Sequence, residues 1–535
     1  MKVHMKKYIQ LHILIMVAAL LSSCGDWLNL EPEDGVTVQE YWKTKEHVAS
    51  AVTGCYASLM NGPVEKMFLW GELRADMLEN GPGINYNYNQ IFDGEISPDN
   101  KTVDWSSFYT VINNCNIVLK YAPGVRKLDA TLTEKQLKEY EAEVLTIRAM
   151  MYFQLVRAFR DVPLALDGYV SDDQDFYLPK TNGDVILDTL IHDLKIASAN
   201  APISYNTTEK NKNRITAWAA KTLLADIYLW KEEYAACNAL CQEIINSGKY
   251  GMIPLEKQIV EITSGGVVVD TVTVPNESDA DQMFINSYVN GNSIESIFEI
   301  PFTTLKTNPF YSLLGASTYT LRPKSTVVEG TIFPEPEYNY SSAADIRGNG
   351  CSYRAGLLWK YIGTSRFGVV RTSTNYTAPW IMYKYADVLL MKAEALTQIG
   401  LNTHNETAQT YYKNAIAAME EVRSVRNAVN TSEYTFTGII DGKSLEKAIL
   451  NERAREFSYE GKRWYDVLRH AKRGNYDGTN IQYLINLAIN SASPEKQQSL
   501  IAKYKDPKRN SHYWPIYVRE IETNPKLIQN EFYAQ

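Results

Sequence analysis

The sequence predicts a mainly α-helical protein in which helix pairs are joined by long loops and short strands. Apolar residues recur at spacings of three and four in many stretches, which is the period of an amphipathic helix. Two of the helix pairs carry small residues where the helices would cross, as in tetratricopeptide units. The remaining stretches are dense in Pro, Gly, Asn and Tyr. With 535 residues, the chain is expected to form two or more packed lobes.

The chain begins with a predicted lipoprotein signal peptide at residues 1–23. Three lysines precede a mostly apolar stretch at 9–20, and residues 21–24, Leu-Ser-Ser-Cys, fit a lipobox. The stretch is too short for a spanning helix, because the bilayer core needs about 20 apolar residues. We therefore expect cleavage before Cys24 and acylation of Cys24. The alternative is an ordinary secretory leader with an incidental cysteine.

Apolar spacing predicts the helices that follow. They are 44–60, 102–121, 133–160, 183–199, 215–231, 233–246, 381–399, 406–427, 443–460 and 463–472. The helix at 133–160 carries one apolar stripe and stops at Asp161-Val162-Pro163, because proline cannot continue a helix. The pairs within 215–246 and 381–427 share the tetratricopeptide-like layout, but they are too degenerate and too far apart to predict a regular solenoid.

Two long stretches are predicted to be non-helical. Residues 79–104 hold three glycines and two prolines among clustered Asn and Tyr. Residues 261–380 include Ser-Gly-Gly followed by Val-Val-Val-Asp-Thr-Val-Thr-Val, which predicts a β-hairpin or an edge strand. Both stretches are too aromatic to be disordered, and long loops in compact domains are usually functional. We therefore expect the ligand site in these loops.

Charge and cysteine content exclude several classes of partner. The formal net charge is −8 and no Lys/Arg block offsets it, so we expect no nucleic acid partner. Apart from Cys24, five scattered cysteines remain, an odd number that does not predict a disulfide framework. Cys237 and Cys241 lie one helical turn apart without further ligands nearby, which favours small buried side chains over a metal site. We expect neither a metal nor a cofactor.

Several ordered motifs resemble the SusD/RagB family of outer-membrane lipoproteins, over nearly the whole chain after the leader. In chain order the motifs read CGDWLNLEPEDGVTVQEYWKTKEHVASAVTGCYASL, EAEVLTIRAMMYFQLVRAFRDVPL, YKYADVLLMKAEAL, ILNERAREFSYEGKRWYDVLRH and YWPIYVREIETNPKLIQN. The chain departs from the family pattern at two places. The family often has Phe-Gly before the Asp-Val-Pro stop, where this chain has Phe159-Arg160, and the usual Pro-Gly-Tyr ending after Gln-Asn is replaced at 531–533.

The resemblance implies a SusD-like fold with tetratricopeptide-like helix pairs. It implies a signal peptide at 1–23, an N-terminal region at 24–260 with the first ligand loop, and a C-terminal region at 261–535 with a loop insertion and the final helix pairs. It also implies a lipid-anchored protein on the outer face of the outer membrane, which captures a nutrient and delivers it to a SusC-like TonB-dependent transporter. Most members of the family take up oligosaccharides, and others take up peptides.

Aromatic and amide side chains in the two loops are the candidate ligand contacts. A tyrosine or tryptophan ring can stack on the apolar face of a sugar while amides and charged groups bind its hydroxyls. Tyr outnumbers Phe 36 to 15, which favours rings with a polar tip at the surface. The candidates are Trp70, Asn80, Tyr86, Tyr88 and Asn89 near the first loop, and Tyr338, Tyr340, Arg347, Tyr353, Trp359 and Tyr361 in the second. Trp70 and Trp359 also fit buried positions.

The favoured function is therefore non-catalytic capture of a glycan, with peptide capture as the alternative. A surface glycosidase would need two carboxylates about 5 to 9.5 Å apart, and no Ser, Cys or zinc motif predicts another chemistry. A helical scaffold that binds only proteins would have aromatic-poor loops, unlike the loops of this chain.

Overall fold

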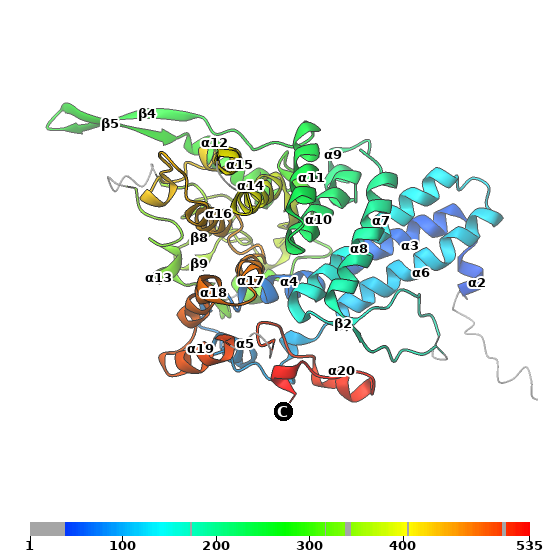
Figure 1. The fold of residues 1–535 in the computed structure, drawn as a ribbon. Coiled ribbons are helices and arrows are strands. Elements are labelled where there is room, and N and C mark those ends of the chain that lie inside the picture. The colour runs from blue at the N-terminus through cyan, green and yellow to red at the C-terminus, as the bar shows by residue number, and fades with distance from the viewer. Residues whose placement is uncertain are drawn as a thin grey trace, which may run out of the picture.

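The computed structural model describes residues 38–171, 174–315, 317–336, 344–403, 406–505 and 510–534. The predicted leader and Cys24 lie outside these residues. The mainly helical fold predicted from the sequence is confirmed (Figure 1). No helix in the described ranges is long and apolar enough to cross a membrane.

The first half of the chain is mainly helical up to residue 246. Its helices are α2 (Val38–Tyr41), α3 (Lys45–Leu59), α4 (Pro63–Glu72), α5 (Tyr86–Phe92), α6 (Ser106–Leu128), α7 (Glu134–Phe159), α8 (Gly183–Asn200), α9 (Thr208–Asn213), α10 (Ala217–Trp230) and α11 (Tyr234–Asn246). The central helix α7 begins with a capping box between Thr133 and Gln136, which satisfies two backbone N–H groups at its start.

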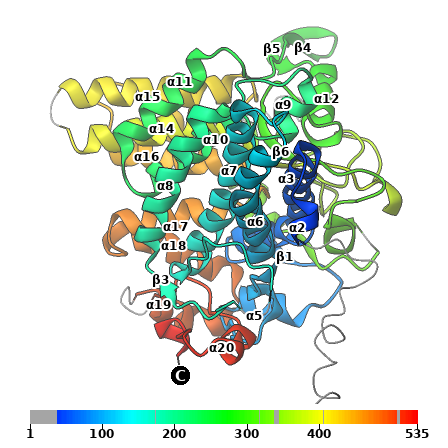
Figure 2. The ribbon, with the colours of Figure 1, turned by 90° about the vertical axis from the view of Figure 1, so that its right-hand side faces the viewer.

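The second half returns to helices after the long loop region. Its helices are α12 (Glu277–Phe284), α13 (Ser325–Val328), α14 (Tyr385–Leu401), α15 (Glu406–Ser424), α16 (Gly442–Glu456), α17 (Arg463–Arg473), α18 (Gly478–Ser491), α19 (Gln497–Lys505) and α20 (Val518–Thr523). The packing order α3, α6, α7, α8, α10, α11, α14, α15 makes one row of neighbouring helices across the molecule, which Figures 1 and 2 show from two sides.

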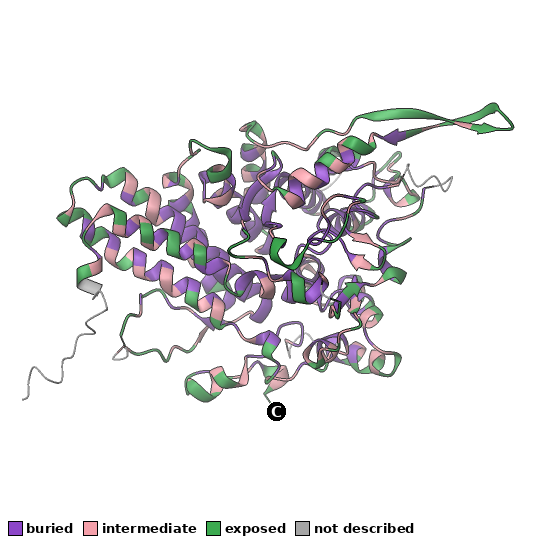
Figure 3. Ribbon diagram, turned by 180° about the vertical axis from the view of Figure 1, so that it is seen from behind, coloured by how far each residue is buried: buried purple, intermediate pink, exposed green. Residues whose placement is uncertain are grey.

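The strands form antiparallel ribbons of two strands each. The pairs are β1 (Leu78–Asn80) with β7 (Leu321–Pro323), β2 (Val162–Pro163) with β3 (Lys180–Thr181), β4 (Lys257–Ser264) with β5 (Val267–Pro275), β6 (Ser296–Ile300) with β10 (Trp380–Lys384), and β8 (Tyr353–Arg354) with β9 (Leu357–Leu358). The β4–β5 ribbon confirms the predicted hairpin. It extends away from the helical body with nearly all of its residues exposed (Figure 3).

The small residues predicted at helix crossings are buried. Ala220 and Ala225 in α10 and Ala386 and Ala393 in α14 are fully buried, so the helices approach each other closely. The prediction that Cys237 and Cys241 are small buried side chains is confirmed, and Cys55, Cys115 and Cys351 are buried free thiols as well.

Several predicted positions of helices were wrong, among them that of the helix expected at 102–121, which spans Ser106–Leu128. The helix expected at 381–399 begins only at Tyr385, because residues 380–384 pair with β6 as a fully buried strand. The stretches 79–104 and 261–380, expected to be non-helical, contain the short helices α5 in the first and α12 and α13 in the second. Residues 380–384 form a strand because a segment distant in sequence pairs with them, and α5 begins at Asn85 because the side chain of this N-cap accepts hydrogen bonds from two backbone N–H groups of the first turn.

Candidate functional site

Two of the predicted ligand residues around the first loop belong to the core. Trp70 is fully buried, its Nε1 donates to the carbonyl of Thr102 at 2.7 Å, and its ring stacks on Phe108 with 4.7 Å between ring centroids. Tyr88 is buried in α5. We therefore remove both from the set of ligand contacts, because a buried ring has no face left for a sugar.

Most of the predicted residues of the second loop are also structural. Trp359 and Tyr361 are buried, and each donates a hydrogen bond of 2.8 Å to a backbone carbonyl. The Arg347 guanidinium is buried and holds three carboxylates of the interior. Tyr353 is half-buried on β8, with its ring 6.0 Å from that of Phe333. Tyr338 and Tyr340 lie outside the described residues.

The remaining predicted residues, Asn80, Tyr86 and Asn89, lie at or near the surface. Tyr86, the first residue of α5, has 73% of its surface exposed. Asn80 is exposed at the end of β1. Asn89 is half-buried, and its Oδ1 has no hydrogen-bond donor among the described residues.

The β1–β7 ribbon brings these residues beside a segment more than 200 residues away in sequence. Asn80 pairs with Leu321, the N–H of Gly81 donates to the carbonyl of Thr320 at 2.8 Å, and the N–H of Gly83 donates to the carbonyl of Tyr319 at 2.9 Å. This segment contributes the half-exposed Tyr319, and it is hydrogen-bonded to the turn that follows Tyr311.

We call the residues Asn80, Tyr86, Tyr311 and Tyr319, which lie on or next to these hydrogen-bonded segments, the tyrosine face. Tyr311 has 41% of its surface exposed, and one edge of its ring packs on Tyr376. The side chains of all four residues make no hydrogen bond to another described residue, so their amide and hydroxyl groups are available to a ligand. Tyr311 and Tyr319 were missed in the sequence, where the tyrosine-rich 261–380 region was the available signal.

The ribbon beside the tyrosine face carries little charge. The β1–β7 ribbon carries one carboxylate, Glu79, which pairs with Arg322 of the opposite strand at 2.8 Å. The ribbon therefore presents neither an unpaired charge nor two facing carboxylates. Elsewhere in the described ranges, no group of three His, Cys, Asp or Glu residues is placed to hold a metal ion. Exposed rings and uncompensated hydrogen-bonding groups suit an uncharged, hydroxyl-rich ligand.

Glycine at residue 83 is needed for the two segments of the tyrosine face to meet. A Cβ atom at Gly83 would lie 2.3 Å from the carbonyl oxygen of Thr318. We expect Gly83→Ala to push the first loop away, to cost about 1 to 3 kcal/mol of stability and to weaken several-fold the binding of a ligand held by the tyrosine face. Urea unfolding and calorimetric titration measure the two effects. Gly124→Ala is the control, because a Cβ atom there meets no atom within 4 Å; an equal loss in that variant would contradict the explanation.

A second aromatic surface lies between α6, α20 and the loop at 164–179. This groove of about 490 Å³ exposes the rings of Phe176 and Tyr177. Its amides, however, hold the loop itself. Asn113 exchanges two hydrogen bonds with the backbone of Tyr169, and Asn524 donates to a backbone carbonyl of the same loop. The groove therefore offers rings without free amides, and it suits a sugar less well than the tyrosine face does.

Comparison with known proteins finds one family that this chain resembles over most of its length. One family model, described as the SusD family, matches residues 316–533, and another, described as starch-binding associating with outer membrane, matches residues 26–229. A SusD-like protein of Formosa agariphila is 25% identical over 551 residues, covering 98% of this chain and 99% of the relative. A SusD-like protein of Bacteroides ovatus is 23% identical and covers 88% of this chain and 83% of the relative.

Solved structures share the fold. A SusD superfamily protein of Bacteroides vulgatus superposes with a TM-score of 0.70 at 21% identity, over 92% of this chain and 99% of the other. A laminarin-binding SusD-like protein superposes with a TM-score of 0.62 at 18% identity, over 91% of this chain and 99% of the other.

Proposed function

This chain belongs to the SusD-like proteins, a carbohydrate-binding family associated with the outer membrane, and we propose that it captures a glycan without cleaving it. In this proposal, acylated Cys24 anchors the protein on the outer face of the outer membrane. The protein then delivers the glycan, an oligosaccharide or polysaccharide, to a SusC-like TonB-dependent transporter.

The tyrosine face carries the proposal. Tyr86 and Tyr311 expose ring surface that buries apolar area when a sugar stacks on it, and Asn80 adds an amide for the hydroxyl rim. The laminarin-binding neighbour binds a glucan on the same fold, which makes laminarin a sensible first probe.

Calorimetric titration with laminarin and a panel of other polysaccharides tests the proposal. We expect Tyr86→Ala and Tyr311→Ala each to weaken binding of the recognised glycan about fivefold, since one stacked ring contributes about 1 kcal/mol. The two substitutions together should weaken it by more than either alone. Tyr86 is mostly exposed, so its replacement should leave the melting temperature unchanged.

Tyr177→Ala is the matched control, because it removes a 48% exposed ring from the groove beside α6. Loss of binding in this variant, with the tyrosine-face variants unaffected, would move the glycan site to the groove. Release of shorter products from the bound glycan would favour a surface hydrolase. Binding of peptide digests to the tyrosine face, without binding of any glycan, would favour peptide capture instead.

A further inference from the structure

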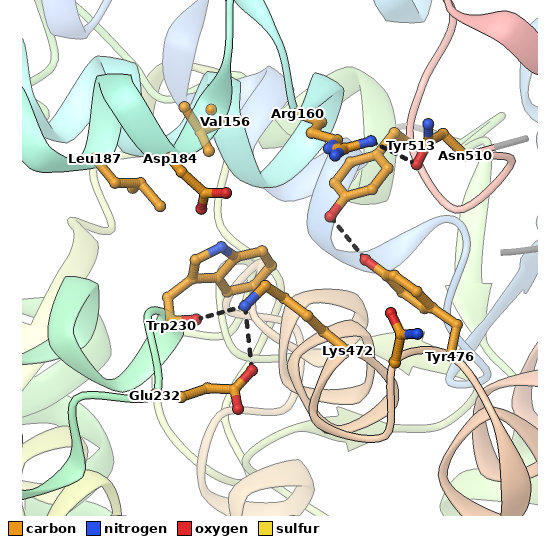
Figure 4. A pocket seen from close by; sticks show the side chains of 12 residues that line it. Val156, Arg160, Asp184, Leu187, Trp230, Glu232, Lys472, Tyr476, Asn510 and Tyr513 are labelled. Carbon is orange, nitrogen blue, oxygen red and sulfur yellow. Dashed lines mark hydrogen bonds and ion pairs between the residues drawn. The ribbon is translucent and has the colours of Figure 1, made fainter. Parts of the chain in front are cut away.

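A second pocket lies away from the tyrosine face, where α7 and α10 end and α8 begins. Its volume is about 560 Å³, within the range of about 300–1,000 Å³ that is typical of small-ligand sites. The C-terminal end of α17 and the segment that contains Asn510 and Tyr513 complete the walls (Figure 4). Five separate segments of the chain thus converge on one cavity.

The backbone around this pocket is unusually strained. Nine described non-glycine residues have positive φ, and five of the nine line this pocket: Arg160, Glu232, Asn475, Tyr476 and Asn510. Positive φ is uncommon outside glycine, and such strain gathers where side chains are held for function. Asparagine tolerates this conformation, so positive φ is more costly at Arg160, Glu232 and Tyr476 than at the two asparagines.

Arg160 occupies the most demanding of these positions. Its φ of 68° and ψ of −73°, together with a hydrogen bond of 3.0 Å from the N–H of Asp161 to the carbonyl of Phe159, define a γ-turn of the rare positive-φ kind. Glycine would adopt this turn without strain. This strained turn makes Arg160 the residue of the pocket from which the inference starts.

The charges in the pocket divide into the ion pair of Lys472 with Glu232, Arg160 with one long ion pair, and Asp184, which has none among the described residues. Lys472 binds Glu232 at 3.3 Å and the carbonyl of Trp230 at 3.2 Å. Arg160 donates one hydrogen bond to Asn510 and lies 3.9 Å from Asp161, with 43% of its side chain exposed. These contacts leave most of the five guanidinium N–H groups to other acceptors.

Asp184 supplies the complementary charge. It is exposed in the first turn of α8, and its carboxylate makes no hydrogen bond or ion pair with another described residue. In Figure 4 the carboxylate points toward the indole of Trp230, across the cavity. One cation and one anion thus face the same space, while the other two charges of the pocket neutralise each other.

The walls do not suit a stacked sugar. Trp230 has only 2% of its surface exposed, and the hydroxyls of Tyr476 and Tyr513 are 2.9 Å apart in a hydrogen bond with each other. Val156, Leu187 and Trp230 are 1–3% exposed, so little apolar surface reaches the cavity and its charged side chains decide what it can bind. A ligand with two opposite charges fits these walls better than a neutral sugar does.

We propose that this pocket binds a short zwitterionic ligand of the amino-acid type, such as a short peptide with free ends. Arg160 binds the carboxylate and Asp184 binds the ammonium group. The proposal does not rest on glycan capture, since the pocket and the tyrosine face have no residue in common.

Calorimetric titration of the purified protein with trialanine tests the proposal, using three capped forms for comparison. We expect trialanine to bind, and trialanine amide and N-acetyl-trialanine each to bind about tenfold more weakly, because each has lost one charge-assisted contact. N-acetyl-trialanine amide should bind weakest. No heat with trialanine, or equal affinities for all four peptides, would overturn the proposal.

Two variants assign the ends of the ligand. The Arg160→Gly variant should bind trialanine amide as tightly as it binds trialanine. The Asp184→Asn variant should bind N-acetyl-trialanine as tightly as it binds trialanine. Asp167→Asn removes a carboxylate from an exposed pair with Lys120 and should bind trialanine as the unaltered protein does. If capping the peptide lowers its affinity for the pocket variants by the same factor as for the unaltered protein, the assignment of the two ends is wrong.

Thermal unfolding separates binding from structure. Arg160→Gly relieves the γ-turn, so its melting temperature should stay the same or rise while trialanine binding falls. A large drop in melting temperature would give Arg160 a structural role and overturn its part of the proposal. Asp184→Asn, which changes charge and not shape, then still decides whether the ammonium end is recognised. If the unaltered protein binds laminaritriose and the Arg160→Gly variant does not, the zwitterionic assignment is overturned.

Discussion

Replacing Arg347 with methionine should lower the free energy of unfolding by about 3 to 5 kcal/mol. The guanidinium binds Asp345 and Glu452 at 2.6 Å each and Glu456 at 3.1 Å, and all four side chains are buried. The two glutamates keep other cations, among them Arg423 for Glu452 and Arg426 for Glu456. Asp345 has an ion pair with Arg347 alone among the described residues, so the substitution leaves a buried carboxylate without a cation.

Urea unfolding of the two proteins at pH 7 measures this loss. Arg126→Met is the matched control, because it removes an arginine from an exposed pair with Glu134, and it should cost less than about 1 kcal/mol. Adding Asp345→Asn to Arg347→Met should restore part of the stability, since the uncompensated charge is then gone. A loss in Arg347→Met as small as that in the control would show that the buried network does not need this cation.

Replacing Glu72 with glutamine should make the protein more stable at neutral pH. Burial raises the pKa of Glu72 from 4.5 to about 8, and the hydrogen bonds from the N–H groups of Gly461 and Lys462 offset only part of that rise. The folded protein therefore keeps this carboxyl protonated at pH 7, whereas the unfolded chain ionises it. The stabilising contribution is complete below about pH 4.5 and is lost progressively as the pH rises to about 8.

Glutamine keeps the acceptor for the two N–H groups and does not titrate. The variant should thus match the unaltered protein near pH 4.5 and exceed its free energy of unfolding by about 3 kcal/mol at pH 7. Urea unfolding at a series of pH values gives the difference between the two proteins. Glu209→Gln, at an exposed site of α9, should show a difference that does not change with pH. The same flat behaviour in Glu72→Gln would mean that Glu72 is ionised in the folded protein.

The amino-acid sequence by itself determined the helical architecture. The apolar stripe of the central helix, its stop before Pro163 and the small residues at helix crossings depend on spacing within one segment, and the structure has them where they were predicted. The same is true of the valine-rich hairpin and of the buried Cys237 and Cys241. These features follow from local periodicity and side-chain size, which any single stretch of sequence contains in full.

Only the tertiary structure decided which residues can meet a ligand. Trp70 and Tyr86 are both aromatic and lie within one stretch of the chain, yet one is in the core and the other is mostly exposed. Arg347 looked like a loop residue for a ligand and instead holds three interior carboxylates. Whether a side chain is buried depends on segments hundreds of residues away, as does the meeting of Gly83 with the carbonyl of Tyr319. Long-range packing fixes these contacts, and the spacing of residues along the chain does not predict them.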